Sequence, residues 1–489
     1  MKLQVLLKDI VDVDVANIEV SDIFLSSQQV TRDSLFFAIP GTVADGHDFI
    51  EDAISNGASA VLCEQLPKNL HDNVTYIQIK DIKSIVGVVA SRFFGSPSHQ
   101  LKVVGVTGTN GKTTVATLLY NLFEKLGYKT GLVSTIKNYI HTNEVPATHT
   151  TPDQITLHRL FKDMVDAGCE YCFMEVSSHA LDQGRVNGIE FTGAIFMNVT
   201  HDHLDYHGTF ENYLLAKRKL FELLKPHAWA LANADDENGE FMLQNTQAAQ
   251  YYYALQKEDG GFAGDINFEG AIIENSFNGV VLDVNGHKIM SQLIGQFNAY
   301  NLLAIYGAAM LLQQEADQVT ARMIELHPAD GRFDVLRDST GKVGIVDYAH
   351  TPDAVENVLS TIAAIKKDDQ KVITVIGCGG DRDKEKRPQM ARIAQQLSDY
   401  VVLTADNPRS EEVLAIIEDM KVGLDHPDDE HVLVTPDRAE AIDTAVYTAR
   451  ANDIVLVAGK GHEDYQEVKG TKHDFSDREV LEEKLRKYS

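Results

Sequence analysis

The sequence predicts an α/β protein divided into several domains, and three observations lead to this prediction. Short apolar runs alternate with helix-like segments over most of the chain. Polar residues gather directly after many of these runs, which is where open α/β sheets bind their ligands. The chain has 489 residues, which is too long for one hydrophobic core and predicts two to four domains.

The composition is that of an acidic globular protein. Apolar residues make up 44% of the chain, and 72 acidic against 44 basic residues give a net charge of −28. This charge argues against nucleic acid or an anionic membrane surface as the main partner, although a local cationic pocket can still hold a nucleotide. Because no apolar run is long enough to cross a bilayer and no charged-then-apolar leader is visible, we expect neither a membrane span nor a secretion signal.

The four cysteines predict buried, reduced thiols. Cys169 and Cys172 form a C-x-x-C pair, but a zinc site of the usual kind needs a second pair. We therefore expect thiols buried beside a strand and a reducing, cytoplasmic location.

The first 98 residues are expected to form a small α/β unit. Its predicted strands are Leu35–Ile39, Ala60–Cys63 and Thr75–Ile79, with a helix over Phe49–Ser55. A polar, glycine-containing loop follows the first of these strands, and it either holds a ligand or only turns the chain. Residues 97–100 (PSHQ) are a candidate linker.

The stretch from Leu101 to Leu119 organises the rest of the chain. It reads LKVVGVTGTNGKTTVATLL, in which an apolar run over Val103–Val106 predicts a buried strand and Thr114–Leu126 predicts a helix. A strand, a glycine-rich turn and a helix form the architecture of a phosphate-binding loop, whose backbone N–H groups and helix N-terminus attract phosphate.

Within this turn, glycines let the backbone curl, a lysine can reach the β- and γ-phosphates, and a threonine offers a hydroxyl to Mg²⁺. The glycines are Gly108 and Gly111, followed by Lys112 and Thr113. The pattern is a G-x-x-G-K-T variant, because Val106 stands where the usual motif has its first glycine. The alternative is an ordinary turn between strand and helix.

Two further strands, Cys172–Val176 and Gly193–Met197, are expected to end beside this loop. The polar residues that follow them are Glu175, Ser177, Ser178, His179, Gln183 and Arg185 after the first, and Asn198, His201, Asp202, His203, Asp205 and His207 after the second. A carboxylate and imidazoles at neighbouring strand ends suit a divalent cation near the phosphates, whereas the alternative is a polar surface loop. A helix over Tyr213–Phe221 then carries Lys217, which could also be a simple counter-charge.

Short strands and turns over residues 260–294 predict a small antiparallel extension. A helix follows over Gly295–Ile305, with Asn298 and Asn301 on one face, where they either bind a ligand or cap the helix. The pattern breaks around Leu326–Arg332, which suggests a domain boundary.

A second α/β pattern occupies the last third of the chain. Its predicted strands are Gly344–Asp347, Val372–Ile376, Tyr400–Thr404 and Ile454–Ala458. Polar segments follow them, namely DYAHTP, GCGGDRDKEKRP, TADNPR and AGKGHEDYQ. Because parallel strands end at one edge of a sheet, these segments should form one site.

Taken together, these residues resemble a known family. The chain contains, in order, GTNGKTT, TTP, MEVSSHAL, NVTHDHLDYHGT, AKRKLF, GRF, DYAHTPDA, GCGGDRDKEKRP, DNPR and AGKGHEDYQ. These motifs resemble the Mur ligases, and within them the enzymes that add the third residue of the peptidoglycan stem. The resemblance implies three domains: a UDP-sugar-binding domain (1–98), a central ATPase domain (99–329) and a Rossmann-like, amino-acid-binding domain (330–489).

The resemblance also implies an ATP-dependent, ADP-forming amide-bond ligase that works through an acyl phosphate and requires Mg²⁺. The implied ATP-binding residues are Gly108, Thr109, Asn110, Gly111, Lys112, Thr113, Thr114, Asn301, Arg332 and Asp347. The implied catalytic residues are Lys112, Glu175, His203 and Lys217, and the implied metal ligands are Thr113, Glu175, His203 and Lys217. By the same resemblance Lys217 is carbamylated (N6-carboxylysine), which would turn a cation into an anionic metal ligand.

For the UDP-N-acetylmuramoyl dipeptide, the resemblance assigns Ser27, His47, Thr150, Thr151, Ser177, Gln183 and Arg185. The family usually has an arginine after the serine of its first motif, and Gln28 stands here instead. One charged contact to the UDP end is therefore replaced or supplied elsewhere.

For the amino acid that is added, the resemblance assigns Arg382, Asp406, Asn407, Pro408, Arg409, Gly459 and Glu463. In this family DNPR marks the enzymes that use meso-diaminopimelate, whose second carboxylate an arginine can bind through two parallel hydrogen bonds. L-Lysine has no such carboxylate, so Arg409 would repel its ammonium.

The alternatives are the same reaction with L-lysine, a ligase like folylpolyglutamate synthetase, and a regulatory protein that uses ATP as a switch. We expect a monomer and no nucleic-acid partner. The sequence leaves the orientation of the domains open.

Overall fold

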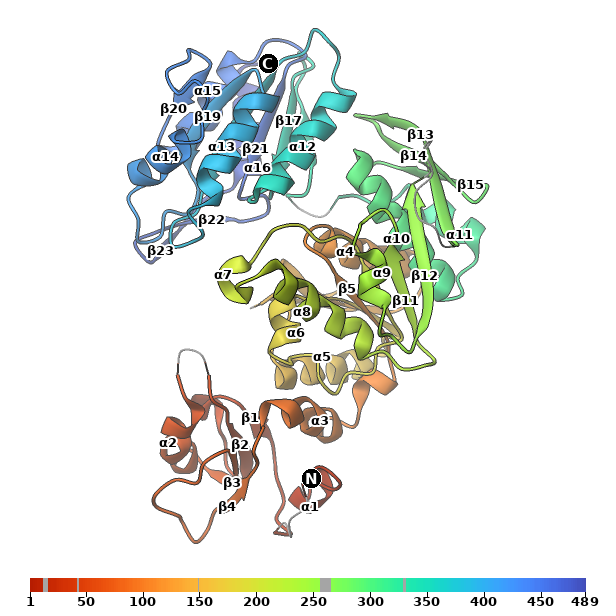
Figure 1. Ribbon diagram of the computed structural model, residues 1–489, viewed down its shortest axis with the longest axis vertical. Helices are drawn as coiled ribbons and strands as arrows, with labels where there is room; N and C mark the ends of the chain where they lie inside the picture. The colour runs from red at the N-terminus through yellow and green to blue at the C-terminus, as the bar shows by residue number, and fades with distance from the viewer. Residues whose placement is uncertain (12–15, 42–43, 148, 256–264, 329–330) are drawn as a thin grey trace.

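The computed structural model describes residues 1–11, 16–41, 44–147, 149–255, 265–328 and 331–489. The chain runs along the molecule in order, with the N-terminal unit at one end, a central unit in the middle and the C-terminal unit at the other end (Figure 1). The structure confirms the α/β fold class. The expected boundary between residues 329 and 330 falls outside the described residues.

The N-terminal unit is a parallel sheet with the strand order β1-β2-β3-β4. Its strands are β1 (Ile23–Phe24), β2 (Ser34–Ala38), β3 (Ala58–Cys63) and β4 (Thr75–Gln78), and its helices are α1 (Leu3–Leu6), α2 (Ile50–Ser55), α3 (Lys83–Phe93) and the short 3₁₀ turns η1 (Ser27–Gln29) and η2 (Gly46–Phe49). The three predicted strands and the predicted helix are confirmed. Alternate residues of the strands supply a separate apolar cluster to each face of the sheet.

The candidate linker is a buried turn and not an extended, solvated connection. Residues Pro97–His99 form the 3₁₀ turn η3, in which Pro97 and Ser98 are buried. The N–H of Glu190 donates to Ser98 Oγ at 3.1 Å, which docks this turn on the central unit.

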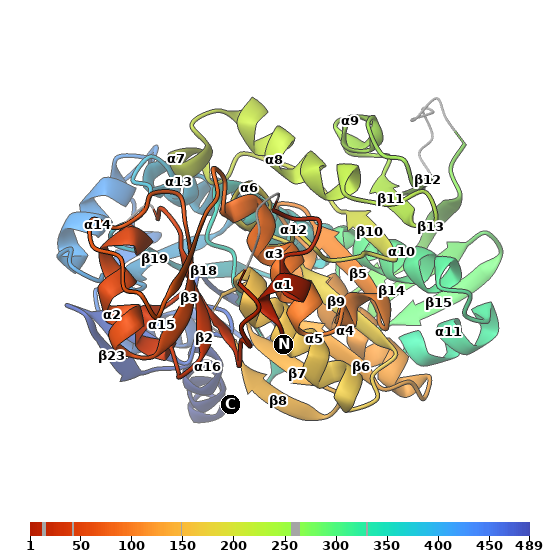
Figure 2. The same cartoon turned by 90° about the horizontal axis from the view of Figure 1, so that it is seen from below.

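The N-terminal and central units also meet through two helices, α3 and α5 (Gln154–Asp166), which lie side by side in both views (Figures 1 and 2). Ile155 of α5 joins the apolar cluster of the N-terminal sheet. Arg159 of α5 donates to Asp22 at 2.9 Å. The interface is therefore apolar at its centre and ionic at its edge.

The central unit is one long sheet with the strand order β15-β14-β13-β12-β11-β10-β5-β9-β6-β7-β8. The strands are β5 (Lys102–Thr107), β6 (Thr130–Val133), β7 (Lys137–Ile140), β8 (Asn143–Pro146), β9 (Tyr171–Glu175), β10 (Gly193–Phe196), β11 (Trp229–Asn233), β12 (Ala249–Leu255), β13 (Phe268–Ser276), β14 (Gly279–Val284) and β15 (His287–Ser291). Strand β14 is antiparallel to both of its neighbours, β13 and β15, so the predicted antiparallel extension is confirmed, and β13 joins it to the main sheet. The hairpin of β7 and β8 was not predicted.

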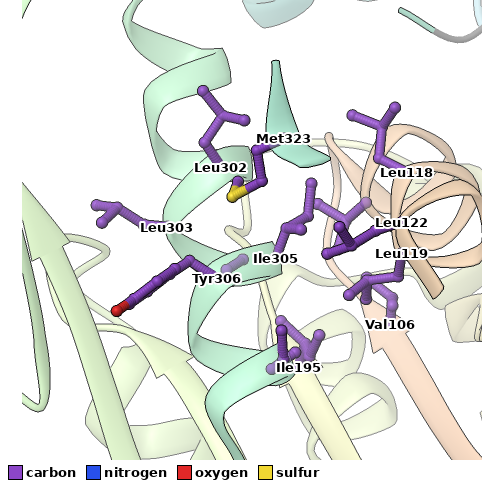
Figure 3. Close-up of a cluster of buried hydrophobic side chains, with 14 of the residues drawn as sticks. Val106, Leu118, Leu119, Leu122, Ile195, Leu302, Leu303, Ile305, Tyr306 and Met323 are labelled. Carbon is purple, nitrogen blue, oxygen red and sulfur yellow. The ribbon is translucent and has the colours of Figure 1, made fainter. Parts of the chain in front are cut away.

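Helices cover both faces of this sheet and bury two cores. On one face lie α4 (Lys112–Lys125), α10 (Gln296–Leu311) and α11 (Ala316–Met323), and on the other lie α5, α6 (Ser178–Asp182), α8 (Phe210–Glu222) and α9 (Gly239–Leu243), with α7 (Leu204–His207) before α8. Leu119 and Leu122 of α4 face Ile305 of α10, above Val106 and Ile195 of the strands (Figure 3). This packing fixes the start of α4, and therefore the phosphate-binding loop, against the sheet.

The C-terminal unit is a sheet with the strand order β16-β17-β21-β18-β19-β20, in which only the edge pair of β16 and β17 is antiparallel. The strands are β16 (Asp334–Arg337), β17 (Val343–Asp347), β18 (Val372–Cys378), β19 (Tyr400–Ala405), β20 (Val432–Val434) and β21 (Ile454–Ala458), with a separate hairpin of β22 (Tyr465–Val468) and β23 (Thr471–Asp474). Helices α12 (Pro352–Ile365), α13 (Lys386–Leu397) and α14 (Val413–Lys421) cover one face, and α15 (Arg438–Thr448) and α16 (Asp477–Lys487) cover the other. The four predicted strands are confirmed.

Two simpler predictions are also confirmed. All four cysteines are buried and have free thiols. Among the described residues, no helix is both long enough and apolar enough to cross a bilayer.

Candidate active site

The phosphate-binding loop lies between the end of β5 and the start of α4, as the sequence predicts, and α4 begins at Lys112, two residues before the predicted start. Gly111 precedes the helix with φ +88°. A Cβ at this position would lie 2.7 Å from Asn301 Oδ1 of α10. Glycine is therefore required here both for the backbone conformation and for the close approach of α10.

Residues from the end of β10 hold the loop in shape. The N–H of Thr109 donates to the Asn198 carbonyl, and the N–H of Asn110 donates to Asn198 Oδ1, both at 2.8 Å. Thr109 Oγ1 lies 3.0 Å from the hydroxyl of Tyr213, a buried residue of α8. The sequence marked Asn198 as one of the polar residues after this strand, but it did not indicate Tyr213.

Two lysines converge on one carbonyl of the loop. Lys112 Nζ donates to the Gly108 carbonyl at 3.0 Å and to the Thr109 carbonyl at 2.9 Å, and Lys217 Nζ of α8 donates to the Gly108 carbonyl at 2.7 Å. Burial lowers the pKa of both amino groups, and the charge of Lys112 further lowers the pKa of Lys217. Lys217 also lies 4.5 Å from the centre of the Tyr213 ring, and the charge of Asp202 partly opposes the drop in its pKa. Among the described residues Lys217 forms no close ion pair with a carboxylate, although the sequence left open that it is a counter-charge.

Glu175, at the end of β9, is fully buried and links three segments. Its carboxylate accepts hydrogen bonds from Thr113 Oγ1 at 2.8 Å and from the N–H of Thr135 at 2.7 Å. Thr135 was not among the predicted site residues. The side-chain oxygens of Thr113 and Glu175 are adjacent hard donors, which is the ligand chemistry that Mg²⁺ prefers.

His203 lies at the start of α7 with φ +54°, and its side chain is partly exposed. Its ring nitrogen Nε2 is 3.4 Å from Asp202 Oδ2, and its ring centre is 4.8 Å from that of His179. Partial burial lowers the pKa of His203, so the imidazole favours the neutral form that binds metals. No group of three or more His, Cys, Asp or Glu residues within the described ranges is arranged to hold a metal ion. The candidate donors that can bind a cation as they stand are the Thr113 hydroxyl, the Glu175 carboxylate and the His203 imidazole, whereas the ammonium group of Lys217 only donates hydrogen bonds.

The other predicted ATP contacts come from α10 and from the C-terminal unit. Asn301 Nδ2 donates to Asn298 Oδ1 at 2.9 Å, and Asn298 Nδ2 donates to the Ile294 carbonyl at 2.8 Å. Asn298 therefore connects the first turn of α10 to the segment before it, and its side chain orients Asn301 toward Gly111. Thr114 is buried in the first turn of α4.

Arg332 and Asp347 lie together on the C-terminal unit. The guanidinium of Arg332 stacks over the ring of Tyr348 at 4.8 Å, and its buried Nε has no hydrogen-bond partner among the described residues. Asp347, at the end of β17, accepts from the N–H of Phe333 at 2.7 Å. Burial raises the pKa of Asp347 to about 6.

One hydrogen bond joins the phosphate-binding loop directly to the C-terminal unit. Asn110 Nδ2 donates to Asp353 Oδ2 at 2.6 Å, from the loop to the first turn of α12. The carboxyl ends of the two large sheets therefore face each other. Asp353 lies within the DYAHTPDA segment, but a side-chain contact 243 residues away in sequence leaves no local signal.

The residues predicted for the UDP-sugar dipeptide fall into two groups. Five of them adjoin Glu175 in the central unit: Thr150, Thr151, Ser177, Gln183 and Arg185. Arg185 donates to the Thr151 carbonyl at 2.9 Å and to Gln183 Oε1 at 2.6 Å, and the N–H of Ser177 donates to Thr151 Oγ1 at 3.1 Å. Thr150 Oγ1 accepts from Thr135 Oγ1 at 3.0 Å. The structure thus brings these five side chains together beside the phosphate-binding loop.

Ser27 and His47 belong to the N-terminal unit. His47 Nε2 accepts from the N–H of Glu64 at 2.9 Å, and His47 Nδ1 lies 2.6 Å from Asp45 Oδ1. The acceptor role of Nε2 places the proton on Nδ1, so His47 connects its loop to the end of β3. Ser27 is buried at the start of η1, where its carbonyl accepts from Asn56 Nδ2 at 2.9 Å.

The predicted amino-acid residues gather at the carboxyl ends of β18, β19 and β21. A Cβ on Gly379 would lie 3.0 Å from Arg409 Nη1 and 3.7 Å from Arg382 Cγ, so both arginines border the same glycine. Arg409 also donates to the Gly380 carbonyl at 2.7 Å and lies 3.4 Å from a carboxylate oxygen of Glu467. The side chain of Arg382 is exposed.

A buried lysine that the sequence did not indicate organises the loop after β21. Lys460 is fully buried, and its Nζ donates to Asn407 Oδ1 at 3.1 Å and to Glu463 Oε2 at 3.0 Å. Asn407 Nδ2 donates to the same Glu463 oxygen at 2.7 Å. A Cβ on Gly459 would lie 2.8 Å from Asp406 Oδ2. The only sequence signal was a lysine between two glycines after a buried strand.

A buried ion pair fixes the two strands that carry these residues. Arg438 donates to both carboxylate oxygens of Asp477 at 2.7 Å, and both side chains are fully buried. The same guanidinium donates to the Ala405 carbonyl at 3.1 Å and to the Ala458 carbonyl at 3.0 Å. These alanines are the last residues of β19 and β21, so Arg438 sets the starting points of both amino-acid loops.

Comparisons with known proteins agree with this arrangement. The Mur ligase family, catalytic domain, matches residues 19–94; the Mur ligase middle domain matches residues 106–309; and the Mur ligase, glutamate ligase domain, matches residues 331–461. The UDP-N-acetylmuramoyl-L-alanyl-D-glutamate--2,6-diaminopimelate ligase of Bacteroides fragilis is 50% identical over 486 residues, and the protein of the same name from Bacteroides thetaiotaomicron is 51% identical over 486 residues, with 99% of both chains covered in each case. A solved structure of a ligase with this name is similar with a TM-score of 0.72 and 31% identity, covering 100% of this chain and 99% of that one. The chain belongs to the Mur ligase family.

Proposed function

We propose that this chain is an ATP-dependent, ADP-forming amide ligase that adds meso-2,6-diaminopimelate to the D-glutamate of UDP-N-acetylmuramoyl-L-alanyl-D-glutamate. The reaction belongs to the synthesis of peptidoglycan precursors. The relatives that are about half identical over nearly their whole length carry the name of this activity. The three matching Mur ligase domains support the energy source and the bond type.

The observation that carries the choice of amino acid is the pair of arginines around Gly379. Arg409 and Arg382 border one glycine at the carboxyl edge of the sheet. Two guanidinium groups suit a substrate that carries an extra carboxylate, because each can bind a carboxylate through parallel hydrogen bonds. On the loop after β21, the carboxylate of Glu463 suits the distal ammonium of diaminopimelate, and Lys460 and Asn407 hold that carboxylate in place.

The reaction proceeds in two steps. A side-chain carboxylate oxygen of D-glutamate attacks the γ-phosphorus of ATP, ADP leaves, and an acyl phosphate forms. The amine of diaminopimelate then attacks the acyl carbon, the C–O bond to phosphate breaks, and the amide, inorganic phosphate and a proton are released. Lys112 and the N–H groups of its loop stabilise the charge on the transferring phosphoryl group, and Arg332 approaches it from the C-terminal unit.

The metal site is proposed at Thr113, Glu175, His203 and Lys217. Mg²⁺ bound there would neutralise phosphate charge and polarise the phosphoryl oxygens. We propose that Lys217 is carbamylated, which reverses its charge. This proposal is supported by the position of Lys217, because a second ammonium group that shares the Gly108 carbonyl with Lys112 repels it.

The remaining assignments follow from the same function. Thr150, Thr151, Ser177, Gln183 and Arg185 would bind the dipeptide end, and Ser27 and His47 the uridine end, with domains over residues 1–98, 99–329 and 330–489. A reaction that consumes ATP and a nucleotide-linked precursor is expected in the cytoplasm. We expect the monomer to be active.

An ADP-release assay tests this function. It contains the UDP-N-acetylmuramoyl dipeptide and compares diaminopimelate with L-lysine side by side. We expect ADP release only when the dipeptide and diaminopimelate are both present. Release that depends on neither would support a nucleotide switch, equal kcat/KM for lysine would reject the specificity, and release with a folate acceptor and glutamate would support the folylpolyglutamate synthetase alternative.

A further inference from the structure

Two loops of the amino-acid site lie back to back. One follows β18 and contains Gly379, Gly380 and Asp381, and the other follows β19 and contains Pro408 and Arg409. A Cβ on Gly380 would lie only 1.9 Å from the Pro408 carbonyl oxygen, so the backbones touch directly. Any shift of one loop therefore moves the other.

Both loops hold a non-glycine residue in a left-handed conformation. Asp381 has φ +54° and Arg409 has φ +49°. This conformation is unfavourable for an L-residue, because Cβ crowds the following carbonyl oxygen. It persists only where surrounding contacts fix the backbone. Ser410 provides some of these contacts, because its N–H and hydroxyl donate to the two carboxylate oxygens of Asp381 at 3.1 and 2.7 Å.

An ion pair between a buried arginine and a partly exposed glutamate spans both loops. Arg387, the second residue of α13, is fully buried and donates to the two carboxylate oxygens of Glu411 at 2.8 and 3.0 Å. The same guanidinium donates to the Gly379 carbonyl at 3.2 Å, and the same carboxylate accepts from the N–H of Asp381 at 2.7 Å. The two side chains thus hold the first loop on one side and, through Glu411, the second loop two residues after Arg409.

On the basis of the function proposed above, we propose that Arg387 and Glu411 are positioning residues for the incoming amino acid. They hold the two loops together, so that Arg382 and Arg409 both stay beside Gly379. In this position the two arginines can bind the same dicarboxylic substrate. Neither side chain needs to touch the substrate. Arg387 belongs to the segment GCGGDRDKEKRP, and Glu411 lies directly after DNPR. The sequence indicates that these segments are functional, but it assigns no role to either residue.

Glu411→Gln tests the proposal. It keeps the size of the side chain but removes the negative charge that accepts both hydrogen bonds from Arg387. Asp419→Asn is the matched control: Asp419, on α14, also accepts from Arg387 at 2.8 Å but belongs to neither loop. In Glu411→Gln we expect KM for diaminopimelate to rise at least about 10-fold, because Arg382 and Arg409 would no longer be held where they bind this substrate. KM for ATP should stay near that of the unmodified protein, because these arginines do not bind ATP. In Asp419→Asn we expect both KM values to be unchanged. Equal KM values for diaminopimelate in the two variants would overturn the proposal.

Hydrogen exchange provides a readout that needs no substrate. The N–H of Gly380 donates to the Asn407 carbonyl at 2.9 Å, and the N–H of Arg409 donates to the Glu467 carbonyl at 3.0 Å. Both amides should lose protection in Glu411→Gln and keep it in Asp419→Asn, and unchanged protection in Glu411→Gln would overturn the lock. If the unmodified protein failed to use diaminopimelate, the proposed function would be wrong, whereas loss of protection would still support a lock between the loops.

Discussion

At the scale of single residues, the site depends on buried charges that are held by backbone and by one another. Lys217 is the clearest case, because its buried ammonium group donates to the Gly108 carbonyl beside the second cation Lys112, and the charge of Asp202 only partly opposes the drop in its pKa. Removing a buried charge affects stability as well as chemistry. The experiments therefore need a control on the same element.

Lys217→Ala should nearly abolish turnover, with partial rescue by a short carboxylate such as acetate. A free carboxylate can occupy the space of the proposed carbamate and supply the anionic oxygens that the variant has lost. ADP release with and without added acetate measures this effect. Lys219→Ala, on the same helix but paired with Asp182 at the surface, should retain activity. Full activity of Lys217→Ala without any additive would show that the side chain is not a metal ligand.

Arg409→Ala should lower kcat/KM for diaminopimelate by about 2 kcal/mol or more, which is about 30-fold, because a charged hydrogen-bond partner is lost. The kcat/KM for ATP should change much less. Arg392→Ala is a suitable control, since Arg392 lies on α13 and donates to the Gly423 carbonyl, away from Gly379. Equal kcat/KM for diaminopimelate before and after the Arg409 change would refute the assignment.

The sequence predicted some of these residues and not others for a physical reason. Glu175 and Asp347 are the last residues of buried strands. Open α/β sheets bind their ligands at the carboxyl ends of their strands, so the sequence alone indicates these two residues. Lys460, Thr135 and Asp353 act through contacts with segments far away in the sequence. A local pattern cannot indicate which of many polar loop residues will meet after folding.

At the scale of elements, the buried strand β21 was predicted with its observed bounds, whereas the edge strands β8 and β16 were not predicted. β21 matches its predicted bounds, Ile454–Ala458, because a fully buried parallel strand is a continuous apolar run. β8 and β16 are mostly exposed or half-buried edge strands without such a run. Their pairing is decided by neighbouring strands, so the sequence alone did not indicate them.

The turn before α4 leads to a prediction about nucleotide binding. In Gly111→Ala the new Cβ would combine a left-handed backbone with a 2.7 Å approach to Asn301 Oδ1. Gly127, after the other end of α4, has φ +94° and open space around it, so Gly127→Ala isolates the backbone cost of about 1–2 kcal/mol.

We expect both variants to lower the melting temperature, but only Gly111→Ala to raise KM for ATP, by at least about 10-fold, because the N–H groups of the loop would be displaced. Thermal unfolding and ADP release as a function of ATP concentration measure the two effects. Similar KM values for ATP in the two variants would contradict a role of this turn in nucleotide binding.

At the scale of the whole molecule, the proposed site draws on residues of all three units. Asn110 and Asp353 join the phosphate-binding loop to α12. The packing of α3 on α5 joins the N-terminal unit to the central one (Figure 2). The sequence predicted the order of the units but not these contacts, since each depends on surfaces that form only after the units fold.

The interface between α3 and the central unit leads to the last prediction. Gly87 of α3 lies against the backbone of the segment after Arg185: a Cβ at Gly87 would be 1.8 Å from the Asn187 carbonyl oxygen. Gly87→Ala must therefore push α3, and the N-terminal unit with it, away from Arg185. Because Ser27 and His47 are on that unit, we expect KM for the UDP-N-acetylmuramoyl dipeptide to rise at least about 10-fold, whereas KM for ATP should stay within about twofold.

Gly95→Ala is the control, since Gly95 follows α3 with φ +79° and nothing within 4 Å of its Cβ. If the two variants gave the same KM for the dipeptide, or if Gly87→Ala raised every KM equally, the N-terminal unit would not bind that substrate through this interface.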